Sequence, residues 1–275
     1  MIRKLLFAAA LLAMLGGALA IAMYREARAD PIVRRADIAL PGLPAGAEIR
    51  VVLISDIHIG MAAMDAGRLG RIVDQINALR PDLVLIAGDF IFGHDPRGAA
   101  RLGEAMIAPL ARLRPRLGTV AVLGNHDHWT GAAAVRSQLA RAHVIVLENE
   151  ARAFGPIALG GVGDDFSHHA DAAATLAAAR ALGKPIVLFT HSPDIAPALP
   201  ADAPLLLAGH THCGQAMLFG RHVVPPVSRY GTRYLCGLVR EGRRTVIVTA
   251  GLGASGVPFR IGAPPDLWLV TLRGR

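Results

Sequence analysis

Five short polar segments of this 275-residue chain carry the side-chain types that bind divalent metals. In two of them, ligand-type residues lie two positions apart, so on an extended chain both face the same way. A donor set of oxygen and nitrogen without thiolate suits Mn, Fe or Zn, and paired metals favour displacement at phosphorus. The segments are Asp56-Ile57-His58, Gly88-Asp89, Gly124-Asn125-His126-Asp127, His191 and Gly209-His210-Thr211-His212.

Nearly every polar segment directly follows a run of aliphatic residues that is typical of a buried strand. These runs cover residues 51–54, 83–86, 120–123, 186–189 and 205–207. In open α/β sheets the carboxyl ends of the strands form the edge at which ligands bind. We therefore expect the polar side chains to converge at one sheet edge.

The first strand-like runs alternate with helix-like stretches, a rhythm that indicates βαβ units. The helix-like stretches are residues 67–79, 98–113, 131–142 and 170–182. After His191 short strands dominate, at 205–208, 216–219, 245–249 and 267–272. A second sheet packed on the first would explain this change. The pattern predicts an α/β domain over residues 48–275, preceded by a linker or edge segment at 30–47.

At these residues the chain resembles the calcineurin-like metallophosphoesterase superfamily, which carries DxH, GD, GNH(D), a lone His and GHxH in this order. Residues 209–215 and the tail at 251–266 further resemble its membrane-associated bacterial phosphodiesterase branch, which includes enzymes acting on UDP-diacylglucosamine. The resemblance implies a four-layer αββα sandwich with the site at one edge, preceded here by one N-terminal helix. It also implies a two-metal centre.

The resemblance distributes seven residues over the two metals, with Asp89 bridging them. It gives Asp56, His58 and His212 to the first metal, and Asn125, His191 and His210 to the second. Taken singly, each residue has an ordinary alternative, such as a capping Asp, a turn Asn or a structural His. Five motifs in the family order favour the metal assignment.

The resemblance excludes His126 from the ligands and lets it donate a proton or hydrogen bond to the leaving oxygen, a role that suits imidazole near neutral pH. Asp127 either orients the His126 ring, as carboxylates do, or makes an N-cap or turn contact. Phe92, three residues after Asp89, predicts an apolar wall near the site and a lipid-like substrate.

The remaining polar residues give weaker expectations. Cys213 and Cys236 predict no disulfide framework, and Cys213 is expected to be a small residue in a tight turn. Arg260 either meets an anionic group or is an ordinary exposed Arg. Six further histidines are expected at surface or structural positions: His94, His128, His143, His168, His169 and His222. For His94 and His128 a role in lining the pocket is the alternative, and for His168 and His169 a place at the mouth of the substrate site.

Residues 1–29 have the pattern of a membrane anchor or signal segment. Residues 5–23 form an uncharged apolar run that is long enough to span a bilayer. Ala27-Arg28-Ala29 also fits a small-x-small cleavage site, so a removed signal is the alternative. A count of flanking Lys and Arg slightly favours a cytoplasmic domain. A short basic start favours export, and we expect a single-pass inner-membrane anchor with the catalytic domain outside.

The net charge of +8 comes almost entirely from Arg, and aromatic residues make up only 5% of the chain. A nucleic-acid partner is therefore a weaker interpretation than an anionic bilayer surface or a compositional bias. The sequence predicts a membrane-anchored, two-metal phosphoesterase that cleaves phosphodiester or pyrophosphate bonds, with a lipid-linked or UDP-lipid substrate. The alternatives are a nuclease and a non-catalytic metal-binding membrane protein, and the intact His126 argues against the latter.

Overall fold

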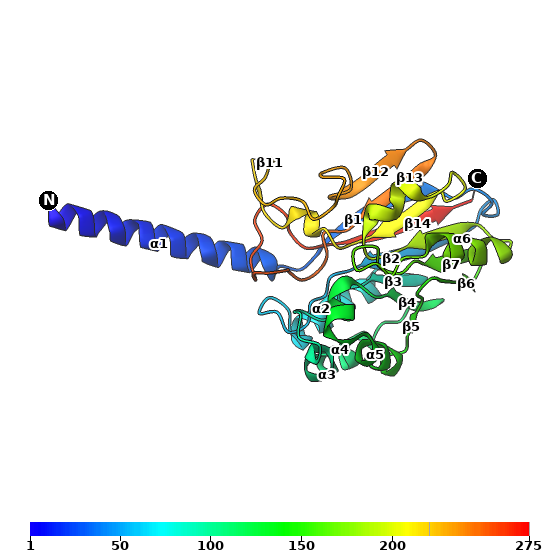
Figure 1. Ribbon diagram of the computed structural model, residues 1–275, viewed down its shortest axis with the longest axis horizontal. Helices are drawn as coiled ribbons and strands as arrows, with labels where there is room; N and C mark the ends of the chain where they lie inside the picture. Colours follow the sequence, from blue (N-terminus) through cyan, green and yellow to red (C-terminus); the bar gives the residue numbers. More distant parts are fainter. Residues whose placement is uncertain (220, 275) are drawn as a thin grey trace.

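A computed structural model describes residues 1–219 and 221–274 of the chain. Two six-stranded sheets pack face to face, and helices cover their outer faces (Figure 1). One apolar helix projects from the domain at the N-terminus. The predicted αββα sandwich with a preceding N-terminal helix is therefore confirmed.

The first sheet has the order β1-β14-β2-β3-β4-β5. Its strands are β1 (Ile32–Ala39), β14 (Asp266–Arg273), β2 (Glu48–Ile54), β3 (Leu83–Ala87), β4 (Gly118–Val122) and β5 (Val144–Val146). Strands β2 to β5 are parallel, and their connections contain α2 (Ala66–Ala78), α3 (Gly98–Leu102), α4 (Glu104–Leu110) and α5 (Asn125–Arg141). The carboxyl ends of β2, β3 and β4 consequently share one edge.

The second sheet has the order β12-β13-β9-β8-β7-β6. Its strands are β12 (Gly237–Glu241), β13 (Arg244–Val248), β9 (Leu205–Ala208), β8 (Ile186–Phe189), β7 (Ile157–Gly161) and β6 (Glu150–Phe154). The central strands are parallel and both edge strands are antiparallel to their neighbours. The outer segments are α6 (Ala172–Ala181) and the 3-10 turn η1 (Pro193–Ala198), and η2 (His212–Gly214) precedes a short hairpin of β10 (Met217–Leu218) and β11 (Arg221–His222).

Alternating side chains on each strand build the layers. Leu53 and Leu85 of the first sheet belong to the same buried cluster as Leu159, Phe189 and Leu207 of the second. The side chains on the opposite face of each strand point outward. Those of the first sheet pack beneath α2 and α5, and those of the second sheet pack beneath α6. Strands buried on both faces explain why these segments are continuous hydrophobic runs in the sequence.

The expected helix at 131–142 begins earlier, at Asn125. Gly124 is extended at the N-cap, and its N–H donates to the carboxylate of Asp127 at 2.9 Å. Gly131, with φ of 118°, interrupts the helix at the residue where the sequence pattern predicts its start. Asn125 and His126 therefore lie in the first helical turn.

The residues expected as a linker or edge segment contain β1, which pairs in parallel with β14 at the edge of the first sheet. The stretch at 98–113 forms two short helices, α3 and α4, that meet at Gly103. A Cβ at Gly103 would lie 2.0 Å from Oε1 of Gln138 in α5, so a larger residue there would displace this side chain, whose amide donates to the Ala99 carbonyl oxygen at 2.8 Å.

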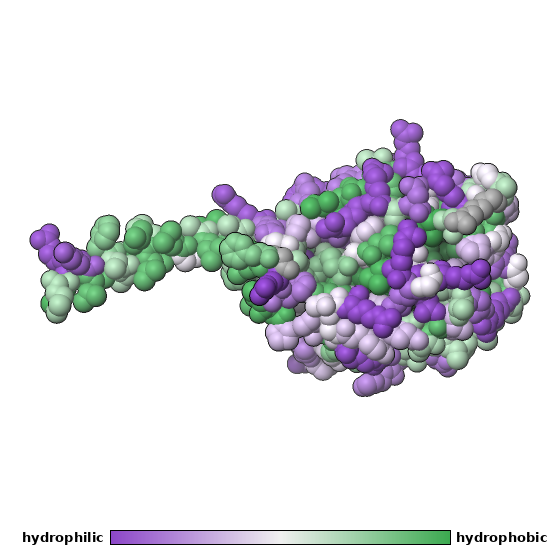
Figure 2. Space-filling view, turned by 90° about the horizontal axis from the view of Figure 1, so that it is seen from above, coloured by the Kyte–Doolittle hydropathy of each residue, from purple (hydrophilic) through white to green (hydrophobic). Residues whose placement is uncertain are grey.

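Helix α1 (Ile2–Ala27) has the length and composition of a membrane-spanning helix, with a mean hydropathy of 2.4 over its most apolar 18 residues and none of that window buried. Apolar surface covers it up to a polar free end (Figure 2). Its last turn is fastened to the domain. Arg28 pairs with Asp65 at 2.7 Å, and the buried Arg68 donates to the carbonyl oxygens of Arg28 and Ala29 at 3.1 and 2.8 Å.

Two truncations test this docking. A chain that begins at Tyr24 keeps the contacts of Arg28 and Ala29, whereas a chain that begins at Pro31 loses them. The shorter chain should be less stable by about 1–3 kcal/mol, because the buried Arg68 then loses two of its carbonyl acceptors, those of Arg28 and Ala29. Thermal unfolding followed by circular dichroism measures the difference, and equal midpoints for the two chains would contradict the docking.

Candidate metal centre

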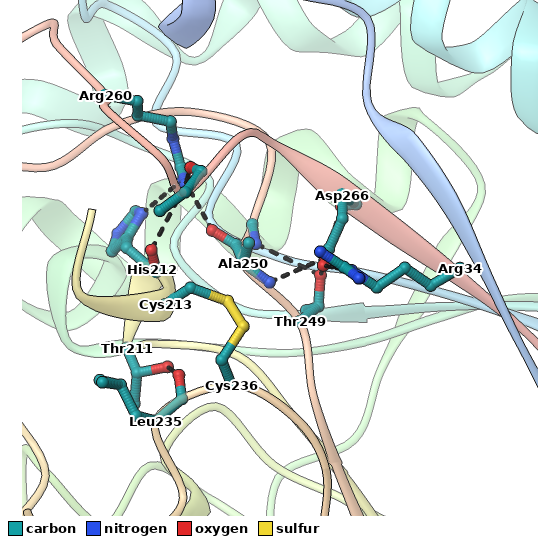
Figure 3. Close-up of a disulfide and its surroundings, with 12 residues drawn as sticks. Arg34, Thr211, His212, Cys213, Leu235, Cys236, Thr249, Ala250, Arg260 and Asp266 are labelled. Carbon is teal, nitrogen blue, oxygen red and sulfur yellow. Dashed lines mark hydrogen bonds and ion pairs between the residues drawn. A yellow bond between two sulfur atoms is a disulfide. The ribbon is translucent and has the colours of Figure 1, made fainter. Parts of the chain in front are cut away.

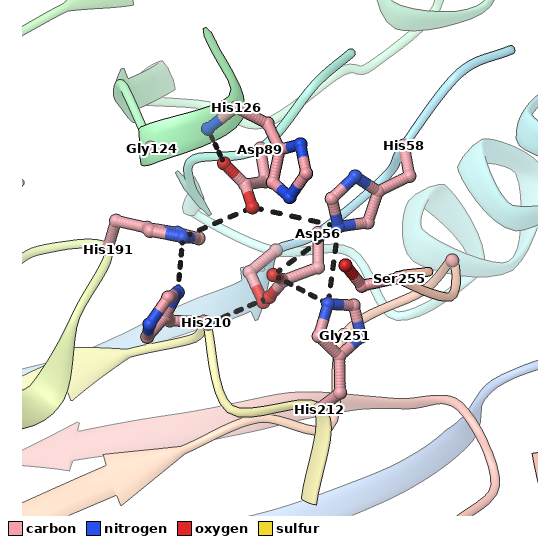
Figure 4. A network of polar contacts seen from close by, with 12 residues as sticks. Asp56, His58, Asp89, Gly124, His126, His191, His210, His212, Gly251 and Ser255 are labelled. Carbon is pink, nitrogen blue, oxygen red and sulfur yellow. Dashed lines mark hydrogen bonds and ion pairs between the residues drawn. The ribbon is translucent and has the colours of Figure 1, made fainter. Parts of the chain in front are cut away.

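The structure brings all seven predicted ligand residues together where strands of both sheets end. Figure 4 labels all of them except Asn125. They follow β2, β3, β4, β8 and β9, so the sandwich itself assembles the cluster from segments far apart in the chain. The residues are Asp56, His58, Asp89, Asn125, His191, His210 and His212. All of them are buried.

Asp56, His58 and His212 form the first group of donors. The Nε2 atom of His212 lies 3.2 Å from Asp56 Oδ1 and 3.2 Å from His58 Nε2. Asp56 Oδ2 accepts hydrogen bonds from the Ser55 hydroxyl and from the His210 N–H, whereas the buried Oδ1 has no hydrogen-bond partner among the described residues. An orphaned buried carboxylate oxygen is costly, and a cation would satisfy it.

Asn125, His191 and His210 form the second group. The Nε2 atom of His191 lies 3.1 Å from Asn125 Oδ1 and 3.1 Å from His210 Nδ1. The other ring nitrogen of His191 donates to the Ala87 carbonyl oxygen at 2.7 Å. Such a second hydrogen bond fixes the tautomer and turns the free nitrogen toward a metal.

Asp89 lies between the two groups. Its Oδ2 is 3.6 Å from His58 Nε2 and 3.3 Å from His191 Nε2. Its Oδ1 accepts the backbone N–H of His126 at 2.9 Å, which holds the carboxylate in this position. One oxygen atom therefore adjoins both donor groups, as a bridge between two cations requires.

The ionisation of two of the ligand imidazoles favours metal binding. Burial lowers the pKa of His58 to about 3 and that of His210 to about 4, so these imidazoles are neutral and keep the lone pair that a metal needs. Burial raises the pKa of Asp56 to about 6. At Asp89 burial acts in the same direction, but the positive charge of His191, whose own pKa is raised well above its ordinary value, outweighs it and holds the pKa of Asp89 well below its ordinary value.

Five of the seven residues have positive φ, a region that L-residues rarely adopt and that costs about 1–3 kcal/mol each. They are Asp56 (53°), His58 (52°), Asp89 (58°), His210 (71°) and His212 (51°). Neighbouring glycines make room for these turns, since a Cβ at Gly209 would lie 2.3 Å from Ser55 Oγ. Strain of this kind clusters at functional sites.

His126 lies at the edge of the cluster. Its Nδ1 donates to the Gly93 carbonyl oxygen at 2.8 Å, so Nε2 is the nitrogen left for a substrate. Its ring stands edge-on to the ring of His58, with the centroids 4.8 Å apart. The position fits a proton donor above a bound phosphate.

The structure corrects the proposal that Asp127 orients the His126 ring. The Asp127 carboxylate is fully buried and accepts the backbone N–H groups of Asp89 (2.9 Å), Phe90 (2.8 Å) and Gly124 (2.9 Å). The alternative turn contact is the one observed. Asp127 clamps the loop after β3 to the first turn of α5, and thereby positions Asp89.

Neither expectation for Arg260 is correct. Its guanidinium is fully buried and donates to the carbonyl oxygens of Ala250 (2.7 Å) and Gly253 (2.9 and 2.6 Å). One of its nitrogens also lies 3.1 Å from His212 Nδ1 (Figure 3). Arg260 therefore holds the loop that carries His212. This role depends on the chain folding back over 48 residues, which the sequence spacing does not reveal.

The sequence predicts no disulfide framework and only a small residue in a tight turn at Cys213, but Cys213 and Cys236 are bonded to each other, with their Cα atoms 4.7 Å apart (Figure 3). The chain returns beside the ligand loop, where the Thr211 hydroxyl donates to the Leu235 carbonyl oxygen at 2.7 Å. The sequence places the two cysteines 23 residues apart and gives no sign of this return.

Aromatic rings surround the cluster, and two of them were missed from the sequence. Trp129 lies 5.0 Å from His126 between ring centroids, and Phe166 lies 4.5 Å from His210. The predicted wall residue Phe92 is 6.1 Å from His58. His94 stacks on Trp129 at 4.6 Å and so lies near the site. The position of Trp129, two residues after Asp127, was the one sequence feature that indicated a place beside the site.

The other histidines outside the motifs have different surroundings. His128 stacks on His169 at 3.6 Å and lies 3.1 Å from a Glu148 carboxylate oxygen. His143 and His168 are exposed. None of these residues belongs to the groups of side chains that could hold a metal within the described part of the chain.

Comparison with known proteins agrees with this geometry. Residues 49–214 match the family model of the calcineurin-like phosphoesterases, and the chain belongs to this family. It is 32% identical to a transmembrane protein with metallophosphoesterase domain from Danio rerio, over 90% of this chain and 59% of the relative. It is 30% identical to an uncharacterized metallophosphoesterase of Helicobacter pylori strain J99, over 89% of this chain and 64% of the relative.

The chain thus spans about three fifths of the length of these two relatives. The structure of Haemophilus influenzae NAD nucleotidase aligns with 77% of this chain and 46% of its own length, at a TM-score of 0.50 and 17% identity, which supports the fold. Family membership implies metal-dependent phosphoester hydrolysis at a dinuclear centre.

Asp127→Asn tests the clamp. In either orientation the amide turns an NH₂ group toward backbone N–H donors and removes the charge, so we expect a loss of ~1.5–3 kcal/mol in stability. Thermal unfolding of the full chain in detergent measures it, with the exposed Asp37→Asn as the matched control. An unchanged midpoint together with a shifted pH profile of turnover would restore the ring-orienting role.

Proposed function

We propose that this chain is a dinuclear metal-dependent phosphoesterase that hydrolyses phosphodiester or pyrophosphate bonds. The observation that carries the proposal is the Asp89 carboxylate oxygen that adjoins both His58 and His191. Asp56, His58 and His212 would hold the first ion, and Asn125, His191 and His210 the second, with Asp89 shared. The donor set suits Mn, Fe or Zn.

A bound pair of cations supplies an acidified water and neutralises charge on the phosphate. The protein supplies the other elements. The first turn of α5 presents its N-terminus toward the site, which favours an anionic group. His126 acts in its doubly protonated form: Nδ1–H stays bonded to the Gly93 carbonyl oxygen, and Nε2–H donates a proton or hydrogen bond to the leaving oxygen.

The substrate that we propose is an amphiphilic phosphate ester, such as a lipid-linked or UDP-lipid molecule. The aromatic side chains of Phe92, Trp129 and Phe166 beside the metal centre support this choice, because they offer apolar contacts around a polar reaction centre. A nuclease is supported only by the net charge of +8. Turnover of an aryl phosphodiester, a UDP-lipid and DNA by the same preparation separates the candidates.

We further propose that α1 is a retained single-pass anchor in the inner membrane and that residues 48–275 form the catalytic domain on the exported side. The Cys213–Cys236 disulfide supports the exported side, because disulfides persist in oxidising compartments. The docked last turn of α1 supports retention.

Metal analysis tests the centre directly. The purified full chain should contain close to two transition-metal ions, chelation should abolish hydrolysis, and Mn or a similar ion should restore it. Asp89→Ala should lose more metal than His212→Ala, because only Asp89 adjoins both groups. Plasma mass spectrometry gives the metal content. Full activity in a metal-free preparation would end the proposal.

Leaving-group dependence tests the role of His126. His126→Ala should keep both metals and lower turnover by ~10²–10⁴-fold for an alkyl diester, the usual contribution of a general acid. An activated phenolate needs little protonation, so its hydrolysis should fall less.

His58→Ala is the matched control for this test. It should lose metal and slow both substrates alike, because His58 belongs to the ligand groups. If His126→Ala instead loses metal and slows both substrates equally, His126 is a ligand or a structural residue.

A further inference from the structure

The Cys213–Cys236 disulfide closes a loop, residues 214–235, that exposes a series of apolar side chains. Phe219 is fully exposed, and the other members expose about half of their surface: Leu218 (42%), Val223 (53%), Val224 (50%) and Val227 (51%). Single exposed apolar residues are ordinary, but such a concentration on one segment marks an interaction surface. We call this segment the closed loop.

The closed loop begins beside the end of the membrane-type helix. The N–H of Met217 donates to the Ile261 carbonyl oxygen at 2.7 Å, and the N–H of the preceding residue, Arg260, donates to the Met23 carbonyl oxygen of α1 at 3.1 Å. Figure 1 shows β11 at the side of the domain from which α1 projects. Val257, whose carbonyl oxygen accepts from Gln215, is also exposed there.

The position of Met23 sets the depth of this surface in a bilayer. Met23 is the last residue of the apolar run at 5–23. At a rise of ~1.5 Å per residue this run extends about 28 Å, close to the ~30 Å of a hydrocarbon core. Residues level with Met23 therefore lie at the membrane surface, where the following Tyr24 and Arg25 are typical interfacial residues.

The charge of the closed loop fits the same environment. Residues 214–235 contain no Asp or Glu, and they include three arginines. Arg229 and Arg233 pair with Asp165 and Glu241 outside the loop, whereas Arg221 takes part in none of the ion pairs among the described residues. Arginines next to exposed apolar side chains suit a surface of anionic lipid head groups over hydrocarbon. A soluble protein partner would give no reason for the closed loop to lie beside the anchor.

We propose that the closed loop is a second membrane contact, which inserts its apolar side chains into the leaflet that α1 enters. The loop starts directly after the metal-centre residue His212, and its closing disulfide is one residue from that side chain. Two contacts hold the domain in one orientation, whereas one helix would let it tilt. The metal centre is thereby kept at the level of the head groups.

Quenching by brominated lipids tests the contact without any need for turnover. The full chain is placed in vesicles of phosphatidylethanolamine and phosphatidylglycerol, with and without bromine on the acyl chains. Phe219→Trp adds a fluorophore at the tip of the closed loop. Ala201→Trp is the matched control, because Ala201 is exposed and lines a cavity with Ala39, at the end of β1 remote from α1.

We expect brominated lipid to remove roughly half of the emission that Phe219→Trp adds to the native tryptophans, as for side chains ~5–10 Å deep in the interface. The emission of Ala201→Trp should not change. Val224→Trp is a second probe at an exposed position. Both loop probes quenched no more than Ala201→Trp would overturn the proposal. Blue-shifted but unquenched emission would also overturn it, in favour of contact with another protein molecule.

Discussion

The position of one carboxylate, that of Asp89, is the constraint on which the site depends. Its two oxygens are divided between the His126 backbone and the space between two imidazole groups. This division requires a left-handed turn at Asp89 and the Asp127 clamp behind it. Because the clamp joins the loop after β3 to α5, the same bonds place Asn125 and His126. One hydrogen-bond network therefore positions His126, Asp89 and Asn125 together.

The centre is costly for a protein without ions. Buried imidazoles face one another at 3.1–3.2 Å, one carboxylate oxygen has no hydrogen-bond partner in the described part of the chain, and five residues hold strained backbone angles. Three buried hydrophobic clusters, one between the sheets and one beneath the helices of each outer face, stabilise the fold that holds these residues in place. Metal ions would offset much of the electrostatic cost, so binding of metal and stability of the domain are linked.

Two buried arginines connect the end of α1 to the candidate metal centre. Arg68 holds the carbonyl oxygens at the end of α1 and that of Leu252, and Arg260 joins Met23 through its backbone and His212 through its side chain. Both guanidiniums are fully buried with carbonyl oxygens as the main acceptors, and burial lowers the pKa of each to about 10. The end of α1 is therefore part of the framework of the site.

The layers, and the polar side chains that meet at the sheet edge, could be predicted from the sequence, because strand runs are local hydrophobic patterns and each motif lies directly after one. The sequence also indicated α1, whose apolar run is continuous. The role of Asp127, the bracing by Arg260, the Cys213–Cys236 bond and the aromatic residues Trp129 and Phe166 emerged only from the tertiary structure. Each of these features depends on a contact between segments that are far apart in the chain. The packing of the two sheets brings those segments together, and no local sequence pattern encodes which segments meet.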